Sequence, residues 1–172
     1  MILIAILSIL PGFIIGLVVS VYRFPQKEVL RLYRIFNKNR LNLNSYWMHY
    51  RNVMDHTSRL IVKPNCETLY STSFIELDKC SYQLKIPEVK DYFSVAFLNK
   101  NTEVLGYITN KELNKAGETY FILSNKKKNH LNNKYLFLDT SLCWIIVRFG
   151  FSSTEAIKNV NKLQDQIGLI PI

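Results

Sequence analysis

Two segments decide the fold class: residues 68–77, TLYSTSFIEL, and residues 142–149, LCWIIVRF. Both are rich in β-branched and aromatic residues, which favour a pleated strand with a buried face. Six other segments have the same character, and short polar stretches separate them. They are residues 59–63, 82–86, 92–98, 104–109, 119–124 and 135–138. Eight short strands at this spacing predict a mainly β fold, either an antiparallel β-sandwich or a partly closed barrel.

A helix is predicted after the last of these strands. Ser152 and Glu155 form an S-x-x-E capping box, in which each side chain can satisfy a free backbone N–H at the helix start. The residues that follow repeat at helical spacing and make one apolar face, and Gly168 is a plausible stop signal. That face consists of Ala156, Ile157, Val160, Leu163 and Ile167. We expect this helix to cover one sheet face or to close one end of the sandwich.

The first 22 residues, MILIAILSILPGFIIGLVVSVY, carry no charged side chain. As a helix they would be about 33 Å long, which is enough for a hydrocarbon core of about 30 Å. They lack the positive start and the small-residue cleavage site of a signal peptide. The sequence therefore predicts an uncleaved transmembrane anchor at residues 1–22. A basic juxtamembrane segment at 23–57 and a β-sandwich domain at 58–172 complete the predicted organisation.

The net charge of +9 is concentrated next to this apolar segment. Residues 23–63 hold nine Lys and Arg against two acidic residues, whereas residues 64–172 hold 13 against 11. This placement favours anionic lipid headgroups as the partner of the charge and argues against nucleic acid. The predicted membrane-surface residues are Arg23, Lys27, Arg31, Arg34 and Lys38. By the positive-inside rule, the same charges favour a cytoplasmic location for the β domain.

A second helix is predicted over about residues 25–38, with Pro25 in its first turn. Its apolar residues Val29, Leu32, Tyr33 and Phe36 recur at helical spacing, and its basic residues lie elsewhere on the wheel. Two placements are compatible with this pattern. The helix lies along the bilayer surface, or it packs its apolar stripe on the β domain.

No strong catalytic or metal-binding motif is present. The sequence contains no P-loop, GxGxxG, GxSxG or HExxH pattern. His49 and His56 would share a helix face but lack a third metal ligand, so we expect no metal and no cofactor. Cys66, Cys80 and Cys143 follow no zinc or disulfide spacing and are predicted to be small buried apolar residues.

The most unusual polar cluster lies in residues 64–71, PNCETLYS, where Asn65, Glu67, Thr68 and Tyr70 should converge near a turn. Downstream, Trp144 and Arg148 should share one strand face, and a buried Arg148 needs an acceptor such as Glu67. One interpretation of these six residues is a turn locked by a buried ion pair. The other is a polar pocket for an anionic or carbonyl-bearing small molecule, in an enzyme or a binding protein.

The same clusters resemble a known family. Residues 62–71 (VKPNCETLYS), followed by 75–78 (IELD), are similar to the PN-x-D-T-L-Y-S … x-D-L motif of domain-of-unknown-function family 1254. Weaker matches follow in the family's order, and together they cover about residues 58–170. They are Pro87 with residues 92–95 (YFSV), residues 101–104 (NTEV) with 106–108 (GYI), and Trp144 and Arg148 with residues 162–166 (KLQDQ).

The resemblance implies an immunoglobulin-like β-sandwich, which in this family is commonly followed by a jelly-roll domain of sister family 1214. No such domain follows in this sequence, so we expect a separate jelly-roll polypeptide as partner. The resemblance implies no catalytic role, and Glu67 stands where the family usually has Asp. Export signals are common in the family, which favours the periplasm. Together these observations predict a single-pass, membrane-anchored envelope protein that acts as a binding or assembly module.

Overall fold

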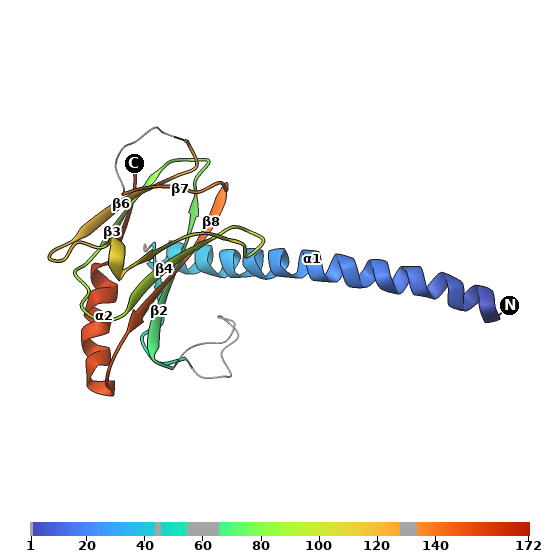
Figure 1. The fold of residues 1–172 in the computed structure, drawn as a ribbon, viewed down its shortest axis with the longest axis horizontal. Helices are drawn as coiled ribbons and strands as arrows, with labels where there is room; N and C mark the ends of the chain where they lie inside the picture. Colours follow the sequence, from blue (N-terminus) through green and yellow to red (C-terminus); the bar gives the residue numbers. More distant parts are fainter. Residues whose placement is uncertain (1, 44–45, 55–65, 128–133) are drawn as a thin grey trace.

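The computed structural model describes residues 2–43, 46–54, 66–127 and 134–172. Within them the chain forms two β-sheets, which we call the two-sheet body, and two α-helices (Figure 1). The helices are α1 (Ile2–Leu43) and α2 (Ile157–Gln166), with the short 3₁₀ helices η1 (Asn110–Glu112) and η2 (Thr154–Ala156). The strands are β1 (Met48–His49), β2 (Thr68–Glu76), β3 (Tyr82–Ile86), β4 (Phe93–Leu98), β5 (Val104–Thr109), β6 (Thr119–Ser124), β7 (Tyr135–Phe137), β8 (Leu142–Gly150) and β9 (Gly168–Pro171).

The mainly β fold class is confirmed. One sheet has the strand order β1-β2-β8-β4-β5, and the other has the order β7-β6-β3-β9. Neighbouring strands are antiparallel except for the parallel pair β6–β7. The more specific assignment to an immunoglobulin-like sandwich stays a prediction.

Most of the strand predictions hold closely. The bounds of β3, β5 and β6 coincide with the predicted segments, and those of β2, β4, β7 and β8 differ by one residue. The strand predicted at 59–63 lies outside the described residues. Two strands were not predicted: β1 has only two residues, and β9 contains a glycine and a proline, which both disfavour strands.

The pairing of β2 with β8 forms the centre of the larger sheet. The two strands are in register over nine residues, from Thr68 opposite Gly150 to Glu76 opposite Leu142. Because side chains alternate along a strand, each strand presents a different set of residues to each side. The inner set, which includes Leu69 and Phe149, packs with Leu84 of the other sheet in one core between the sheets.

The outer set on β2 and β8 is covered by the C-terminal half of α1. Val29 and Phe36 are each only 1% exposed and pack against Phe74 of β2. The ring centres of Phe36 and Phe74 lie 5.5 Å apart, and the Trp144 ring stacks on Phe74 with a centre-to-centre distance of 5.7 Å. The apolar stripe of α1 therefore packs on the β domain, the second of the two placements compatible with its pattern, and is not free to lie on a bilayer.

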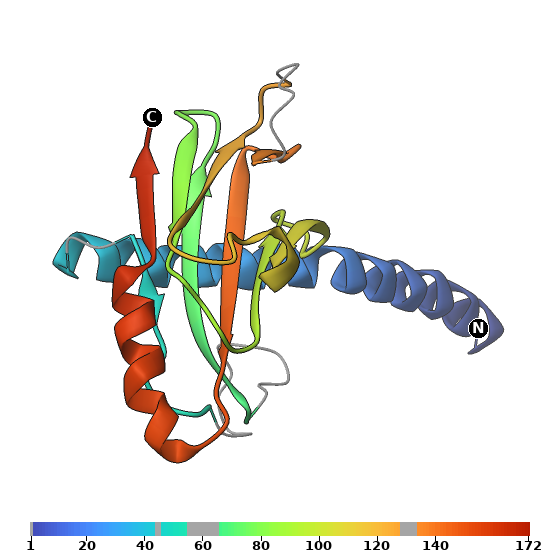
Figure 2. The ribbon, with the colours of Figure 1, turned by 60° about the vertical axis from the view of Figure 1, so that its left-hand side comes forward.

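α1 is one continuous helix with Pro11 and Pro25 inside it, so the prediction that a helix begins at Pro25 is wrong. A proline is common in the first turn of a helix, so the local sequence around Pro25 predicts a helix start there. The prediction fails because the apolar residues before Pro25 belong to the same helix. Figures 1 and 2 show that the N-terminal half of α1 projects away from the two-sheet body. In the part of the chain that the structure describes, no helix is both long enough and apolar enough to cross a membrane, so the transmembrane segment at residues 1–22 is not supported.

α2 lies beside the sheets, with Val160 buried in the core and Ile157 and Leu163 packed against it (Figure 2). Its predicted apolar face is thus confirmed. The predicted capping box is wrong, because α2 starts after Ala156, which makes no side-chain cap hydrogen bond. η2 separates Ser152 from the helix start by a full turn, which removes Ser152 from capping distance.

Replacing Phe36 by alanine should lower the free energy of unfolding by about 3 to 5 kcal/mol, because it removes the ring that packs on Phe74 and leaves a cavity between α1 and β2. Urea unfolding followed by tryptophan fluorescence measures this, since Trp144 lies in the same cluster. The matched control is Leu41→Ala on the same helix, where the side chain is 81% exposed and the change should stay within about 0.5 kcal/mol. Equal effects of the two substitutions would contradict the packing described for α1.

Candidate functional site

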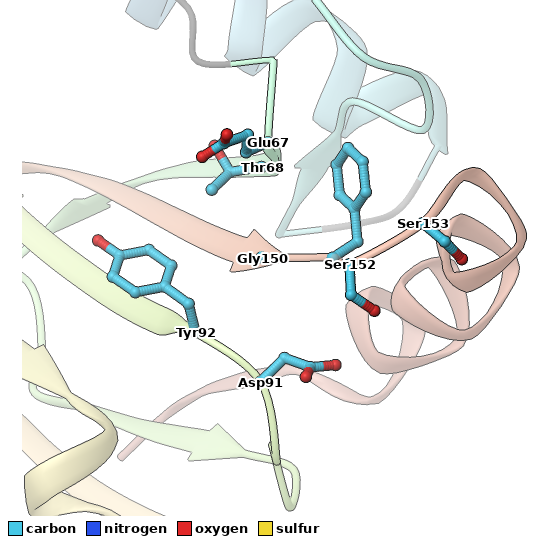
Figure 3. Close-up of a pocket in the computed structure, with 8 residues that line it drawn as sticks. Glu67, Thr68, Asp91, Tyr92, Gly150, Ser152 and Ser153 are labelled. Carbon is cyan, nitrogen blue, oxygen red and sulfur yellow. The ribbon is translucent and has the colours of Figure 1, made fainter.

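A cavity of about 870 Å³ opens at the end of the larger sheet, where β2 begins and β8 ends (Figure 3). We call it the terminal cleft. Three chain segments far apart in the sequence line it: residues 67–68, 91–92 and 150–153. Its volume lies within the range of small-molecule sites, about 300 to 1,000 Å³.

Backbone hydrogen bonds hold the three segments together. The Gly150 N–H donates to the Tyr92 carbonyl at 2.7 Å, and the Phe151 N–H donates to the Glu67 carbonyl at 3.3 Å. A Cβ atom at Gly150 would lie 2.8 Å from the Cβ of Tyr92, which is closer than real contacts allow. Glycine at position 150 is therefore needed for the close approach of β8 to the segment before β4.

The described lining of the terminal cleft is acidic and rich in hydroxyl groups. Glu67 and Asp91 contribute carboxylates, and Ser152 and Ser153 contribute hydroxyls (Figure 3). None of the eight described lining residues is Lys, Arg or His. The Tyr92 hydroxyl donates to Ser94 Oγ at 3.1 Å, so the phenol is anchored while its ring remains 56% exposed.

Only part of the predicted pocket lies in this cleft. Glu67 and Thr68 line it, whereas Asn65 lies outside the described residues. Tyr70, Trp144 and Arg148 are not among the cleft's described lining residues, and they lie on the outer face of β2 and β8. Trp144 donates its indole N–H to Thr72 Oγ1 at 2.6 Å and lines a cavity of only about 10 Å³, too small for a ligand. The structure thus separates the five candidate residues that it describes into two groups.

Arg148 shares its strand face with Trp144, as the alternation predicts. It is directly opposite Tyr70, and its guanidinium lies 5.9 Å from the centre of that ring. The ion pairs between described residues do not include one between Arg148 and Glu67. The register explains this, because Glu67 is three residues, or about 10 Å, further along the strand than Tyr70.

A buried polar network joins β1, β2 and α2. His49 Nδ1 lies 2.8 Å from Ser71 Oγ, and the Gln164 amide donates to Ser71 Oγ at 3.1 Å and to the Tyr70 carbonyl at 2.9 Å. Ser71 and Gln164 are completely buried. A Ser–His pair of this kind resembles a nucleophile and its base, but no substrate can reach Ser71, so the network is structural. The burial of Gln164 and its role in this network were not predicted, because a single glutamine in a helical sequence does not indicate a buried position.

Burial is the main cause that lowers the pKa of His49 to about 4, and the nearby Arg51 lowers it further. The imidazole is therefore neutral near pH 7. Arg51 itself is held by the carboxylate of Asp165 and donates to the Asn161 carbonyl at 2.8 Å, which links β1 to α2 a second time.

The cysteine prediction is only partly right. Cys143 is buried in the core, and burial raises the pKa of its thiol to about 12, which makes it inert at neutral pH. Cys66 is exposed and Cys80 is half-buried, so neither is the fully buried residue expected. Among the described residues, no three His, Cys, Asp or Glu side chains come together as a possible metal site. His56 lies outside these residues.

With the fold and the cleft in view, the chain can be compared with known proteins. The family model described as "Protein of unknown function (DUF1254)" matches residues 43–171. The chain belongs to the DUF1254 family. The matched residues include the two-sheet body, α2 and the described lining of the terminal cleft, whereas nearly all of α1 lies before them.

Two solved structures share the fold of this DUF1254 protein. The VPA0106 protein from Vibrio parahaemolyticus is 11% identical with a TM-score of 0.57, and a protein from Burkholderia cenocepacia is 14% identical with a TM-score of 0.54. Each match covers 89% of this chain but only 36% and 48%, respectively, of the other. The chain thus spans less than half of either relative. No curated protein matches the sequence.

Acid should destabilise the protein between about pH 6.5 and pH 4 through His49. The folded state holds the pKa of His49 near 4, whereas an unfolded histidine titrates near 6.5, so the unfolded state binds more protons in this window. Stability therefore rises with pH across the window and levels off above it. Thermal unfolding midpoints over this range should fall less steeply for His49→Gln than for the wild type. Parallel curves for the two proteins would rule out His49 as the cause.

Proposed function

We propose that this DUF1254 protein is a binding module attached to a lipid bilayer through the N-terminal half of α1, which presents the two-sheet body at the membrane surface of the cell envelope. One observation carries the proposal: the described large apolar side chains between residues 13 and 24 of α1 are about half to two thirds exposed. They are Phe13, Ile14, Ile15, Leu17, Val18, Val19, Val21 and Phe24. Figure 1 is consistent with this, because that part of α1 lies clear of both sheets.

The exposed apolar side chains of this part of α1 require contact with lipid or with another protein. Exposed apolar surface is unfavourable in water, and a helix that is apolar on every side is normally buried in protein or lipid. The described side chains from Pro11 to Val21 include no charged residue, and the first charge after them is Arg23. A lipid environment satisfies such a segment without requiring a complementary protein groove.

The basic residues of α1 support lipid as the cover. At about 100° per residue, Arg23, Lys27, Arg31, Arg34 and Lys38 fall within about 80° of one another around the helix axis. Val29 and Phe36, which pack on β2, lie on the opposite side. The stripe therefore faces away from the two-sheet body and is exposed. Anionic headgroups are the partners that such charges favour at a bilayer surface.

The position of each charge along α1 makes the proposal testable. Arg23 and Lys27 lie within about 6 Å of each other along the axis, next to the apolar half, whereas Arg34 and Lys38 lie about 16 and 22 Å beyond Arg23. The Debye length is about 8 Å at physiological salt. With the apolar half in lipid, only the first pair is close enough to the headgroups to contribute strongly.

The full-length Arg23→Gln/Lys27→Gln variant should bind anionic vesicles about tenfold or more weakly than the wild type, because each charge near the surface contributes about 1 kcal/mol. The matched variant, Arg34→Gln/Lys38→Gln, should bind almost as well as the wild type. Vesicle co-sedimentation at several salt concentrations measures both. Equal losses in the two variants would contradict an inserted α1, because a helix lying flat uses all of its charges.

The apolar contact has its own test. Ile15→Asp/Val19→Asp should abolish binding to neutral vesicles, since both side chains lie in the exposed apolar half. Leu41→Asp places a charge on an exposed apolar position at the other end of α1 and should leave binding unchanged. Failure of the wild-type protein to bind both anionic and neutral vesicles would overturn the proposal.

A second candidate function is assembly with a separate jelly-roll polypeptide, with the two-sheet body as an immunoglobulin-like sandwich. The supporting observation is the outer face of the smaller sheet. Ile122 of β6 and Ile170 of β9 lie opposite the same residue, Gln83 of β3, and are 38% and 50% exposed. Tyr120, 41% exposed, lies two residues from Ile122 on the same face of β6. Exposed apolar side chains grouped around a polar one on a sheet face are typical of a contact with another protein.

Purification of the tagged full-length protein in mild detergent, with mass spectrometry of retained chains, tests this second function. A stoichiometric jelly-roll protein should be retained by the wild type and lost from Ile122→Asp/Ile170→Asp. Val104→Asp, at an exposed position on the edge strand β5 of the other sheet, is the control and should retain it. Retention that is insensitive to Ile122 and Ile170, or no jelly-roll chain at all, would exclude this surface.

A further inference from the structure

We propose that a second cavity, lined by three lysines, binds the phosphate group of a small anionic molecule. This lysine cavity has a volume of about 540 Å³, and its described lining comes from segments 88–90 and 110–115. Its volume is within the range of small-molecule sites. The inference goes beyond lipid attachment, because the lysine cavity lies in the two-sheet body and its binding does not require α1 to be in a membrane.

The lysine cavity lies where two connections pass between the sheets. Residues 88–90 belong to the connection from β3 of the smaller sheet to β4 of the larger one, and residues 110–115 belong to the connection from β5 back to β6. Gln26 of α1 donates to Asn101 in the turn at the other end of β4 and β5. Each of these strands has six residues, so the lysine cavity lies about 20 Å from that contact with α1.

Hydrogen bonds of two asparagine side chains fix the second connection. Asn110 Oδ1 accepts from the Phe93 N–H at 2.8 Å. Asn114 Nδ2 donates to the Glu118 carbonyl at 2.7 Å, and Asn114 Oδ1 accepts from Lys134 Nζ at 2.7 Å. Because both amides are used within the protein, they hold the wall of the lysine cavity in place, and the other polar side chains of its described lining are charged.

These charged side chains favour an anion. Lys90, Lys111 and Lys115 are exposed, and the ion pairs between described residues include none of them. Glu88 is the single acidic residue of the described lining, and its carboxylate already accepts from the Gly117 N–H at 3.1 Å. Three ammonium groups and one carboxylate give the described lining a net positive charge, which attracts anions and repels cations.

The acidic residues close to the two segments in the sequence do not cancel this charge. Glu112 accepts from the N–H and the hydroxyl of Thr109, each at 2.7 Å, and Glu118 pairs with Lys85 at 2.5 Å. Asp91 lines the terminal cleft (Figure 3). None of these three carboxylates belongs to the described lining of the lysine cavity.

Phosphate is the anion that best matches three lysines. A lysine ammonium is a compact point charge with three donors, and it binds phosphate without the planar geometry that arginine requires. A phosphate group has close to two negative charges and three acceptor oxygens at neutral pH, so one group can contact several ammonium groups. A carboxylate has one charge and two oxygens. Soluble phosphate compounds and lipid headgroups share the phosphate group, and binding to vesicles distinguishes these two sources.

The first test compares inorganic pyrophosphate with acetate at equal ionic strength. Calorimetry and amide chemical shifts follow binding to the full-length protein in nonionic detergent. Pyrophosphate should bind saturably, shift the amides of segments 88–90 and 110–115, and bind at least about tenfold more tightly than acetate. Equal binding of the two anions, or no saturable binding of pyrophosphate, would refute the proposal.

Three variants locate the binding. Lys111→Gln/Lys115→Gln should weaken pyrophosphate binding about tenfold or more. The matched control is Lys158→Gln/Lys162→Gln, an exposed pair with the same spacing on α2, and it should not change binding. Glu88→Gln keeps a hydrogen-bond acceptor but removes a negative charge, so it should tighten binding about threefold or more. Equal losses in the two lysine pairs would mean that pyrophosphate responds only to total charge, which rules out this cavity.

Vesicles that contain phosphatidic acid identify the source of the phosphate group. Weaker co-sedimentation of Lys111→Gln/Lys115→Gln than of Lys158→Gln/Lys162→Gln would assign the lysine cavity to a lipid headgroup. Equal co-sedimentation, together with loss of pyrophosphate binding in the first pair alone, would assign it to a soluble compound. Because pyrophosphate binding is measured without lipid, its failure is distinct from failure of lipid attachment through α1.

Discussion

The structure depends on the nine-residue pairing between β2 and β8. Both strands lie in the interior of the larger sheet, so most of their residues on both sides are buried. The inner side chains make the core with the smaller sheet, and the outer ones receive the apolar stripe of α1. The same register ends with Thr68 opposite Gly150, and the pairing of β4 with the other edge of β8 adds residues 91–92, so three distant segments meet at the terminal cleft. The β2–β8 ladder therefore contributes to the core, to the contact with α1 and to two of the three segments of the candidate site.

Sequence patterns predict the strands well where the pattern and the burial agree. In β3, Tyr82, Leu84 and Ile86 are buried and the intervening Gln83 and Lys85 are not, as the alternation indicates. β9 was missed because Gly168 and Pro171 argue against a strand, and only its pairing with β3 makes it one. The apolar stripe of α1 was compatible with either lipid or protein. Hydrophobic periodicity shows which face is covered, but not what covers it.

The candidate site was only partly predictable for a related reason. Glu67 and Thr68 are neighbours in the sequence, so a local polar cluster revealed them. Asp91, Ser152 and Ser153 lie in connecting segments and join the cleft only through strand pairing, which no local pattern records. Arg148 has a side chain suited to binding an anion. It lies two residues before Gly150 of the cleft, however, and there its guanidinium is near the Tyr70 ring. The residues of a pocket built from three separate segments can be identified only when the pairing register of the strands is known.

The continuity of α1 has a mechanical consequence. Because α1 continues as a helix through Pro25 and then packs on Phe74, the direction of its N-terminal half is coupled to the orientation of both sheets, apart from the bending that an internal proline allows. A flexible linker at this point would average over all orientations. A continuous helix instead limits the directions in which the mouth of the terminal cleft can point and its distance from whatever holds the free end of the helix.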